Sequence, residues 1–536
     1  MSGKKVILVT LTLLVSFTFV NSLGNAFVSD DIAEIAQKTT IGDLGYIIHT
    51  YSLGIIRHLI YWTTYHIAGL TPLAFRIINI FFHLGSTILI YQILSNIYRS
   101  RRLAFFAASL FAVHPAIAEA FVWISGGIYT QYTFFFLLSF MLYIISQKSR
   151  KRYFSAVVFY LFSLMSHPVM PIGLFVVFPL YEFCFGNFKK NWVRTLPFFL
   201  LSLTYLLINL AALPQREETL QQVHYQQKGI DNPLIQIPVA ISSYFELLFF
   251  PKTLTLYHSE LSFSQISFAL RAVFTMVFFG LILYGLKKNK SVFFWLSFFL
   301  ISLSPTLTPF RFNWIVAERY LYLPSLGIFA LTGFILDKIA SIGKYKNVIY
   351  SIFAIILISL SARAIIRNIE WKNEDNLWIA TGKTSPSSPN THNNLGDVYG
   401  RWGNKERSLQ EFKTAISLKP DYADAYHNAG NVYRELGQLD KALEYYQKAA
   451  SLSPILWQSY QNMAAIYFQE KQYDSALNYM QKAITINPKN LNLRLNLAVI
   501  FLAKGDKQSA KQIFEEILKI DPQNQLAQQG LVEASK

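Results

Sequence analysis

Apolar runs of about 20 residues, repeated along the first two thirds of the chain, restrict its fold more than any other feature. A helix needs about 20 apolar residues to cross a bilayer, and only helices and closed barrels satisfy their backbone hydrogen bonds there. We read eleven such runs as membrane-spanning helices: 5–22, 73–96, 103–122, 128–147, 153–169, 171–186, 193–213, 266–286, 291–309, 320–338 and 347–366. The sequence therefore predicts an all-α protein that begins with a multi-span helical bundle.

The distribution of charge agrees with this reading. Residues 1–370 hold 29 Lys and Arg against 14 Asp and Glu, whereas residues 371–536 hold 19 against 17. The cations of the first part cluster between apolar runs, on one side of the membrane if eleven spans are correct. This is the positive-inside pattern and marks the cytoplasmic side, not a nucleic-acid surface. The loop 23–72 and the C-terminal part then lie outside.

Two apolar segments need a separate interpretation. The first run follows Lys4 and Lys5, as a signal peptide would, but no small-residue cleavage motif follows before Phe27. We therefore expect a retained anchor. The segment 235–250 is apolar but carries Glu246 and is flanked by prolines. We expect it to be an interfacial or re-entrant piece, and if it crosses, the orientation of everything after it inverts.

The C-terminal part is a repeat array. Prolines recur every 34 residues, at Pro386, Pro420, Pro454, Pro488 and Pro522. Between them, small residues and aromatics recur in phase over four units, which is the tetratricopeptide repeat (TPR) pattern. Proline ends the second helix of each unit, and the small residues allow two helices to cross closely. We expect a membrane domain over 1–366, a junction over 367–388 and, over 389–536, four repeats followed by a capping helix.

The most informative polar residues are Asp30 and Asp31, directly after the first run. Carboxylates beside a membrane are costly and tend to be functional. Adjacent like charges raise the pKa of one member, which suits a general base. Two interpretations remain open: one aspartate deprotonates an acceptor hydroxyl while the other holds the site together, or the pair lies in a solvated loop and caps a following helix.

Further segments, taken together, resemble a known family. They are RIINIFFHLGS at 76–86, HPAIAEAFVWISG at 114–126, AERYLYLPSLG at 317–327 and WKNEDNLW at 371–378, ahead of the repeats. With the acidic pair after the first span, they resemble the GT-C class of glycosyltransferases. Within that class, the chain is similar to the protein O-mannosyltransferase-like family of transmembrane proteins with C-terminal TPRs. The resemblance implies a polyprenyl-phosphate sugar as donor and a polypeptide acceptor.

The resemblance also implies roles for single residues. Asp30 is the expected base, with Asp31 as a supporting carboxylate or as the base itself. A guanidinium grips phosphate through two hydrogen bonds, so Arg319 is the expected partner of the lipid phosphate and Arg311 lies in the same loop. The alternative is that Glu318 and Arg319 form a structural ion pair.

Four more candidates lie in the first loop and in the third run. Arg57 and His58 either meet the phosphate or anchor an amphipathic helix to headgroups. His114 and Glu119 form an intramembrane ionisable pair that either shapes the substrate pocket or is satisfied by a neighbouring helix. No metal site is expected, although both aspartates have the chemistry to hold a divalent ion. The single cysteine, Cys184, excludes an internal disulfide.

We therefore expect a membrane glycosyltransferase that moves mannose or a similar hexose to Ser or Thr of proteins on the extracytoplasmic side. The TPRs are expected to recruit the acceptor. Two alternatives remain: a GT-C enzyme that acts on a glycan or lipid, and a non-catalytic membrane-anchored TPR scaffold. Eleven spans are more than an anchor requires. The absence of disulfide-capable cysteines and of a retention signal favours a bacterial inner membrane over an endoplasmic reticulum. The sequence indicates neither a nucleic-acid partner nor an oligomeric state.

Overall fold

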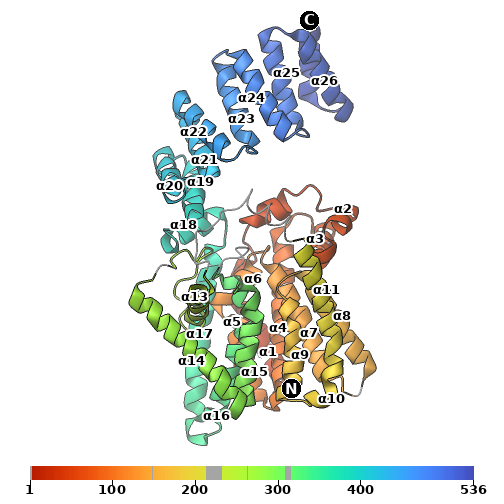
Figure 1. Cartoon of the computed structure of the whole chain (residues 1–536), viewed down its shortest axis with the longest axis vertical. Coiled ribbons are helices and arrows are strands. Elements are labelled where there is room, and N and C mark those ends of the chain that lie inside the picture. Colours follow the sequence, from red (N-terminus) through yellow and green to blue (C-terminus); the bar gives the residue numbers. More distant parts are fainter. Residues whose placement is uncertain (1–2, 148, 213–231, 262, 308–314) are drawn as a thin grey trace. The chain divides into compact units, whose positions relative to one another are not determined.

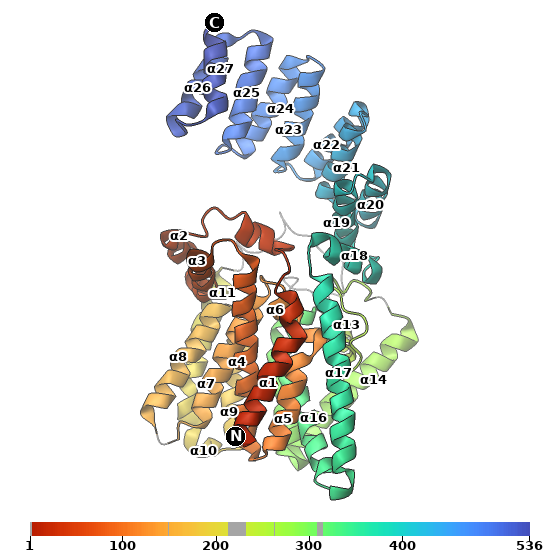
Figure 2. The same cartoon turned by 180° about the vertical axis from the view of Figure 1, so that it is seen from behind.

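The computed structural model describes residues 3–147, 149–212, 232–261, 263–307 and 315–536. Every regular element in these residues is a helix, as the sequence predicts. The chain divides into two compact units, Met1–Thr384 and Ser385–Lys536. Figures 1 and 2 show both units from opposite sides, and each is described by itself.

The first unit is a bundle of apolar helices. Among its described residues, 6 helices are long and apolar enough to cross a membrane: Gly3–Ser22, Pro72–Tyr98, Gly127–Ile144, Phe188–Ala211, Gln265–Lys288 and Gly343–Glu370. They contain α1 (Gly3–Phe19), α4 (Pro72–Tyr98), α7 (Gly127–Ile144), α11 (Leu196–Ala211), α14 (Gln265–Lys288) and α17 (Lys346–Glu370). Each coincides with one expected span, so the chain has transmembrane character.

The other expected spans are shorter helices. They are α5 (Arg101–Val113), α8 (Arg150–Ser166), α9 (Val177–Cys184), α15 (Lys290–Leu303) and α16 (Ser325–Ala340). The expected span 103–122 is not one continuous helix. Proline disfavours the helical conformation in the residue before it, and His114, which precedes Pro115, is extended at φ −71° and ψ 123°. The chain continues as a short 3-10 turn, Pro115–Ile117, and as α6 (Glu119–Val122).

Short polar segments set the helix ends on the side where the basic residues cluster. The hydroxyl of Ser100 accepts a hydrogen bond from the backbone of Leu103 and begins α5. Ser149 does the same for α8, and Asn289 for α15. These side chains satisfy backbone N–H groups that have no partner inside a helix. The turns between neighbouring helices are therefore short and well defined.

One apolar helix runs across the bundle. In Figure 1, α13 (Pro233–Phe249) is seen end-on, whereas α4, α7 and α15 run along the vertical axis of the picture. It is anchored to α14, where Arg271 binds Glu246 with an Nη2–Oε1 distance of 2.8 Å and donates to Ser242 at 2.7 Å. This is the direction expected of an interfacial helix over 235–250.

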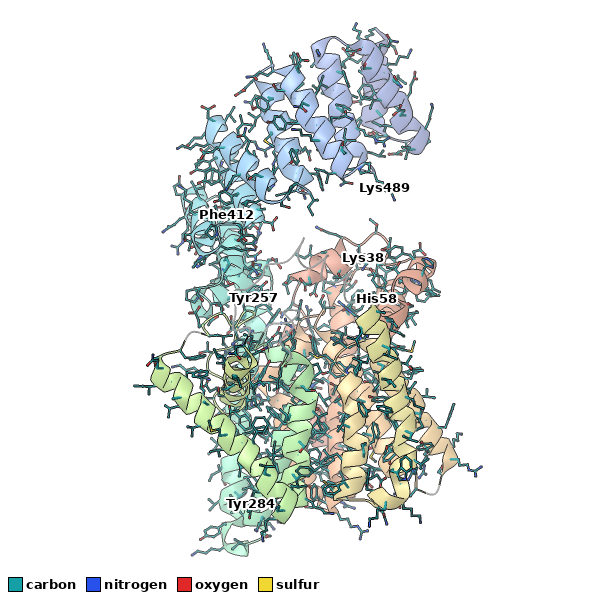
Figure 3. All side chains as sticks on the ribbon, viewed as in Figure 1. Lys38, His58, Tyr257, Tyr284, Phe412 and Lys489 are labelled. Atoms are coloured by element: carbon teal, nitrogen blue, oxygen red, sulfur yellow. The ribbon has the colours of Figure 1, made fainter. Side chains whose placement is uncertain are left out.

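The elements that carry the first loop and the candidate site residues gather at one end of the bundle. They are Ile32–Ala36, α2 (Leu44–Thr50), α3 (Ile55–Ala68), α6, the 3-10 turn Glu318–Leu321 and α18 (Glu374–Thr384). Figure 3 shows Lys38, His58 and Tyr257 at this end and Tyr284, near the end of α14, at the other. We call it the outer end, because the basic clusters between helices lie at the opposite end.

The second unit is a TPR solenoid. Four helix pairs, α19 (Pro389–Arg401) to α26 (Lys507–Ile520), are followed by α27 (Gln525–Ser535). The remaining bounds are α20 (Lys405–Leu418), α21 (Ala423–Glu435), α22 (Leu439–Leu452), α23 (Trp457–Gln469), α24 (Tyr473–Ile486) and α25 (Leu491–Lys504). The second helix of every pair ends two residues before a proline of the 34-residue series, because proline cannot continue a helix.

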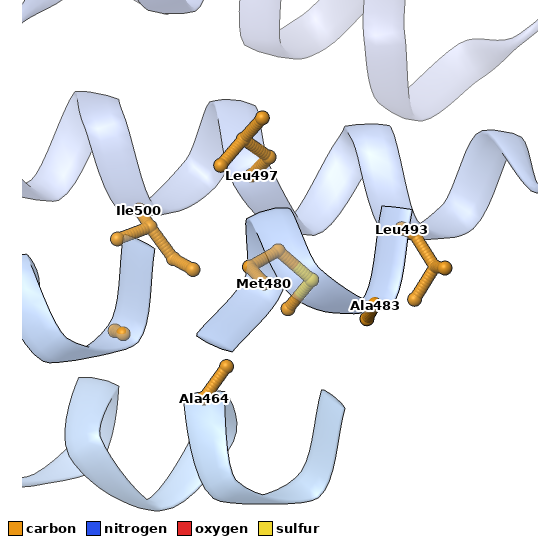
Figure 4. Packing of buried hydrophobic residues seen from close by; sticks show 7 residues of the cluster. Ala464, Met480, Ala483, Leu493, Leu497 and Ile500 are labelled. Atoms are coloured by element: carbon orange, nitrogen blue, oxygen red, sulfur yellow. The ribbon is translucent and has the colours of Figure 1, made fainter. Parts of the chain in front are cut away.

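The small residues of the repeats are required by close helix crossings. A methyl group added to Gly396 would lie 2.5 Å from the ring of Phe412, and one added to Gly430 would lie 2.8 Å from Tyr446. Between repeats, buried apolar residues form continuous clusters. Figure 4 shows one, in which Ala464 and Met480 of the third repeat face Leu497 of the fourth.

Candidate active site

The two aspartates after the first span lie in different environments. Asp30 is exposed, whereas Asp31 is fully buried. The carboxylate of Asp31 accepts hydrogen bonds from the backbone of Ser125 at 2.7 Å and of Val28 at 3.3 Å. Burial raises the pKa of Asp31 to about 6, although these hydrogen bonds and the charge of Arg76 lower it. Asp31 therefore holds the loop in place and Asp30 faces outward. The side chain of Asp31 does not cap the helix that follows it.

Arg76, at the start of α4, links the first loop to α6. Its guanidinium donates to the carbonyl oxygens of Asn25 at 2.7 Å, Ala26 at 3.0 Å and Val122 at 2.9 Å. Its side chain is fully buried. A buried guanidinium with several hydrogen bonds fixes a backbone geometry that apolar contacts alone would leave loose.

The segment 371–378, which follows the last span, contacts the same loop. The backbone N–H of Ser29 donates to Glu374, whose other oxygen accepts from the indole of Trp378 at 2.7 Å. The backbone of Ala26 donates to the carbonyl of Lys372 at 2.9 Å. Ser29 has a φ of 54°, which non-glycine residues rarely adopt. Glu374 therefore stabilises an unusual backbone conformation directly before Asp30.

Two buried ion pairs join the segments 114–126 and 317–327 to the last span. Arg319 binds Glu119 with an Nη1–Oε1 distance of 2.5 Å. Glu318 instead binds Arg367 of α17 at 3.0 Å, so Glu318 and Arg319 have different partners. Burial raises the pKa of Glu318 to about 8, although Arg367 lowers it. A buried ion pair of this kind favours the arrangement in which both partners meet, because either charge buried alone would be destabilising.

Tyr257 is a buried phenol that responds to the acidic pair and to Arg319. Its ring stacks on Trp378 with centroids 5.9 Å apart. Burial raises the pKa of the Tyr257 phenol, the carboxylates of Asp30, Glu374 and Glu119 raise it further, and Arg319 lowers it. The charges of Asp30 and Arg319, which are far apart in the sequence, therefore both act on this phenol.

Arg57 contacts Tyr61, whose hydroxyl donates to the carbonyl of Ile124 at 3.1 Å, next to Ser125. Its guanidinium is 5.2 Å from the ring of Tyr61. Burial by itself lowers the pKa of Arg57, but Tyr61, Glu34 and Asp30 raise it above its ordinary value. Within the described residues, its Nε atom is buried and has no hydrogen-bond partner. A cation in this position has the capacity to bind an incoming anion.

His58 has a different character from its neighbour. It stacks on Tyr51 with ring centroids 3.7 Å apart, and its Nδ1 lies 3.1 Å from the carbonyl oxygen of Gly54. Burial and then the charge of Arg57 lower the pKa of His58 to about 4. The ring is neutral at physiological pH and therefore orders the start of α3 without supplying charge.

Of the two remaining candidates, His114 does not join the site. Its Nε2 lies 2.9 Å from the carbonyl oxygen of Leu248 and its Nδ1 accepts from the backbone of Ala116. Both ring nitrogens thus have partners, and His114 links the end of α5 to α13. Arg311 lies outside the described residues.

Several buried polar atoms of these segments lack a protein partner. Among the described residues, the buried atoms without a hydrogen-bond partner include the indole nitrogens of Trp123 and Trp371, the hydroxyl of Ser125, and Nε of Arg57 and Arg367. The two indoles stack with centroids 5.9 Å apart, and Arg319 lies 5.6 Å from the Trp123 ring. Buried donors are normally satisfied, so these fit a polar substrate or ordered water.

A metal centre has less support in the described part of the chain. There, no group of three or more His, Cys, Asp and Glu side chains is placed to hold a metal ion. The two aspartates alone would supply part of a coordination shell, because Mg²⁺ and Ca²⁺ bind six or more oxygen atoms.

Sequence reasoning missed Arg76, Tyr257, Arg367 and the role of Glu374. Arg76 and Glu374 stand in segments 76–86 and 371–378, so the resemblance pointed to them without indicating what they touch. Tyr257 lies in no such segment and gives no sequence signal. The segment 317–327 likewise does not reveal that its glutamate pairs with α17.

The fold and the site define a helical membrane protein with a TPR solenoid, in which an aspartate pair and arginines meet at one end of the bundle. TPR models, each described as tetratricopeptide repeat, match residues 389–422, 423–455 and 467–534. Over most of its length the chain is similar to proteins named protein O-mannosyl-transferase, which confirms the resemblance noted in the sequence.

Three relatives illustrate this similarity. A Caenorhabditis elegans protein O-mannosyl-transferase is 25% identical over 443 residues, 75% of this chain and 61% of the relative. Human TMTC3 is 24% identical over 399 residues, covering 67% of this chain and 43% of the relative. Human TMTC4 is 24% identical over 409 residues, covering 64% and 55%. The chain thus spans about half the length of the curated relatives it matches.

Solved TPR structures are among those similar to part of the chain. The crystal structure of MamA covers 27% of this chain and 85% of MamA, with 21% sequence identity and a TM-score of 0.25. YrrB, described as a TPR protein with an unusual peptide-binding site, covers 36% of this chain with 20% identity and a TM-score of 0.26. Neither carries an argument about the membrane unit.

Proposed function

We propose that this protein is an integral membrane glycosyltransferase that moves a hexose, such as mannose, from a polyprenyl-phosphate donor to Ser or Thr hydroxyls of proteins. One observation carries the proposal. The first loop and the four segments that resemble the O-mannosyltransferases meet around Asp30, which is exposed beside a fully buried Asp31. The names of the relatives support protein O-mannosylation as the reaction.

The reaction assigns a separate role to each group. Asp30 accepts the proton of the acceptor hydroxyl as its oxygen bonds to the anomeric carbon. The bond between that carbon and the phosphate oxygen breaks, and the lipid phosphate leaves with the electron pair. A carboxylate at hydrogen-bonding distance from the hydroxyl is suited to this general-base step. Asp31 positions the loop and does not touch the substrate.

Arginines stabilise the departing phosphate. The charge of Asp30 acts on Arg57, whose Nε is unsatisfied within the described residues. Arg319 donates to Glu119 through Nη1, and its other guanidinium nitrogens are suited to a phosphate oxygen. Charge that develops on the leaving group is stabilised most by cations already fixed in place. The reaction then requires no resident metal.

The same proposal gives the two units a division of labour. The donor reaches the site from the membrane and the acceptor from water. The repeat unit recruits the polypeptide acceptor, since TPR arrays bind protein segments. We place the outer end and the repeats on the extracytoplasmic side, because the basic clusters lie between helices at the opposite end. In a bacterial inner membrane this side is the periplasm.

Substitution of each aspartate tests the proposal. The purified protein in nanodiscs is given a radiolabelled polyprenyl-phosphate mannose and a Ser/Thr-rich protein acceptor. Asp30→Asn is expected to lower transfer about 1,000-fold, which is within the usual contribution of a single general base, about 10²–10⁴. Asp440→Asn, on the exposed surface of the repeats, serves as the control.

Three outcomes would overturn the assignment or part of it. Full transfer by a folded Asp30→Asn variant removes the base. Transfer to a glycan or lipid acceptor, with none to protein, keeps a glycosyltransferase but excludes protein O-mannosylation. If no wild-type transfer occurs with any acceptor while the protein still binds its partners, the chain is a membrane-anchored scaffold.

A further inference from the structure

Two indole rings join the buried ion pairs of the site into a closed ring of contacts. The guanidinium of Arg367 lies 5.4 Å from the ring of Trp371, which stacks on Trp123. On Trp123 lies the guanidinium of Arg319, 5.6 Å from the ring. Arg319 directly follows Glu318 in the chain, and Glu318 binds Arg367. The segments 114–126, 317–327 and the end of the last span therefore meet at one place.

Five buried polar atoms at this place have no hydrogen-bond partner among the described residues. They are the indole nitrogens of Trp123 and Trp371, Nε of Arg367, Oε2 of Glu318 and Nε2 of His258. The His258 nitrogen lies 3.8 Å from Oε1 of Glu318, which is beyond hydrogen-bonding distance. We call these five residues the polar cluster. Buried polar atoms are normally satisfied, so several unsatisfied ones in contacting side chains indicate a ligand.

The remaining polar atoms of the charged pair are firmly held. Oε1 of Glu318 accepts hydrogen bonds from the backbone of Thr255 and from Nη2 of Arg367, the latter at 3.0 Å. Nη1 of Arg367 donates to Glu370 at 2.5 Å. Glu318 and Arg367 are at most 1% exposed. The unsatisfied Oε2 and Nε thus belong to side chains whose orientation is already fixed, as in a preformed binding site.

The chemistry of the unsatisfied atoms distinguishes between ligands. The two indoles and Nε of Arg367 are N–H donors, whereas an ionised Glu318 is an acceptor. A phosphate has acceptor oxygens only, so it would leave the carboxylate of Glu318 without a donor. A hydroxyl group accepts from an N–H and donates to a carboxylate at the same time. A molecule with several hydroxyl groups therefore fits the polar cluster better than an anion does.

We propose that the polar cluster binds the hydroxyl groups of the hexose on the lipid-linked donor. This inference rests on the proposed function and names the sugar subsite of that same site. Arg319, the proposed phosphate ligand, contacts Trp123 of the cluster, so the sugar lies next to its own phosphate. A hexose that is linked through its anomeric carbon keeps several hydroxyl groups to meet the unsatisfied atoms.

A subsite of this kind determines which sugar the enzyme accepts. A site built to hydrogen-bond a hydroxyl group rejects the analogue that lacks it, because the buried polar groups of the site are then left unpaired. The indole faces are already covered by each other and by the two arginines. Discrimination therefore depends on the N–H edges of the indoles and not on stacking against the sugar.

The test compares the same lipid with and without its sugar. The full chain in nanodiscs, without acceptor, is titrated with radiolabelled polyprenyl-phosphate mannose and with polyprenyl phosphate. Trp371→Phe and Trp123→Phe each remove one N–H and keep an aromatic ring. Each is expected to weaken binding of the mannosyl lipid about 2- to 10-fold, the effect of one hydrogen bond, and to leave polyprenyl phosphate unaffected. A variant that folds poorly would instead lose both lipids together.

Two controls give the comparison its meaning. Trp192→Phe removes an indole N–H at an exposed position beside Lys189 and Lys190, and it should bind both lipids as the wild type does. Donors that each lack one sugar hydroxyl complete a double-mutant cycle. The analogue without the hydroxyl that meets Trp371 should bind the wild type more weakly, yet bind Trp371→Phe as well as the complete mannosyl lipid does.

Three results would overturn the proposal and leave the unsatisfied atoms to ordered water. The first is equal wild-type affinity for the two lipids. The second is an equal effect, or no effect, of both indole substitutions on the two lipids. The third is strict additivity of the substitutions with every deoxy analogue.

The proposed function and this inference fail separately. Asp30→Asn is expected to keep sugar-dependent binding, because Asp30 acts on the hydroxyl of the acceptor. Sugar-dependent binding without transfer to any acceptor would overturn the transferase and leave the sugar site. Transfer without any sugar-dependent binding would overturn the polar cluster as the sugar site and leave the transferase.

Discussion

Ser29 donates its backbone N–H to Glu374, a residue that follows it by 345 positions. This bond holds the strained residue before Asp30 in place, and the second oxygen of Glu374 is fixed by the indole of Trp378. The orientation of the proposed base is thus set by a segment that comes after the last membrane span. Glu374 acts as a positioning residue, since it acts on the reaction through the backbone.

Substitution of Glu374 should therefore reduce the rate more than binding. A base displaced by about 1 Å loses up to about 100-fold in rate, so we expect Glu374→Ala to lower kcat by about 10- to 100-fold with the KM for the donor little changed. Glu374→Gln retains an acceptor oxygen and should recover part of the loss. The comparison is Glu444→Gln, which is exposed in the repeats. A rise in KM with kcat preserved would assign Glu374 to substrate binding instead.

The buried aspartate predicts a dependence of stability on pH. The pKa of Asp31 is raised from 3.8 to about 6 in the folded protein, so the folded state holds this proton more tightly than the unfolded state. The resulting stabilisation is complete below about pH 4 and is lost as the pH rises through 6. It amounts to about 3 kcal/mol.

Melting curves check this sign. Between pH 4 and pH 7, the melting temperature of the wild type should fall relative to that of Asp31→Asn, which cannot ionise. Above pH 7 the difference should be constant. Asp440→Asn should follow the wild type throughout. A wild-type melting temperature that rises relative to Asp31→Asn over this range would contradict the burial of a carboxyl group with a raised pKa.

The Arg319–Glu119 pair should behave as one unit. Removing one partner of a buried ion pair typically costs about 3–5 kcal/mol, because the other charge stays buried alone. We expect Arg319→Met and Glu119→Gln each to lower the melting temperature clearly, and the double variant to lower it less than the sum. A double-mutant cycle measures the coupling. Strict additivity would show that the pair does not contribute to the fold.

Transfer kinetics test whether Arg319 also binds the lipid phosphate. Arg319→Lys retains the charge but loses the fork that grips phosphate. We expect it to raise the KM for the lipid donor several-fold while the acceptor KM remains unchanged. An unchanged donor KM in this variant would leave Arg57 as the phosphate ligand and restrict Arg319 to a structural role.

Close helix crossings in the repeats predict a site-specific loss of stability. The methyl group of Gly430→Ala would lie 2.8 Å from Tyr446. Overpacking of this kind costs about 1–3 kcal/mol, which circular dichroism of the repeat transition should detect. Gly400→Ala meets only the rotatable hydroxyl of Ser408 at 3.3 Å and should be neutral or stabilising, since alanine favours helix formation. A reversed order of the two variants would contradict the packing.

Chelation tests the proposed absence of a resident metal. Transfer by protein treated with excess EDTA, and then assayed in metal-free buffer, should remain within twofold of the untreated rate. Loss of activity that Mg²⁺ or Mn²⁺ restores would assign the two aspartates to a divalent cation. In that case the Asp30→Asn and Asp31→Asn variants should both weaken metal binding.

The fold follows from the sequence to the extent that it depends on periodic patterns. Apolar length predicts the six long helices, and the 34-residue series of Pro420 to Pro522 predicts the end of every second helix in the repeats. The length of an apolar run does not predict where a proline interrupts the helix within it. The helix that begins at Arg101 ends at Val113 because a proline stands two residues further on, and the apolar composition continues past the break.

The candidate site is less accessible to sequence reasoning, because contacts between distant segments leave no local pattern. Asp30 and Asp31 are adjacent in the chain, yet one is exposed and the other is buried against Ser125. Glu318 and Arg319 suggest an ion pair with each other, whereas the turn directs them to Arg367 and Glu119. The sequence therefore predicts which segments matter but not which side chains meet.

The bond from Ser29 to Glu374 also has a consequence for biogenesis. A ribosome must synthesise the final span and release the segment behind it before the first loop can acquire its finished geometry. Until then, the loop that carries Asp30 lacks its hydrogen bond to Glu374. If the proposed function holds, a nascent chain that is still being inserted would be inactive, and its sugar donor would not be lost to hydrolysis during assembly.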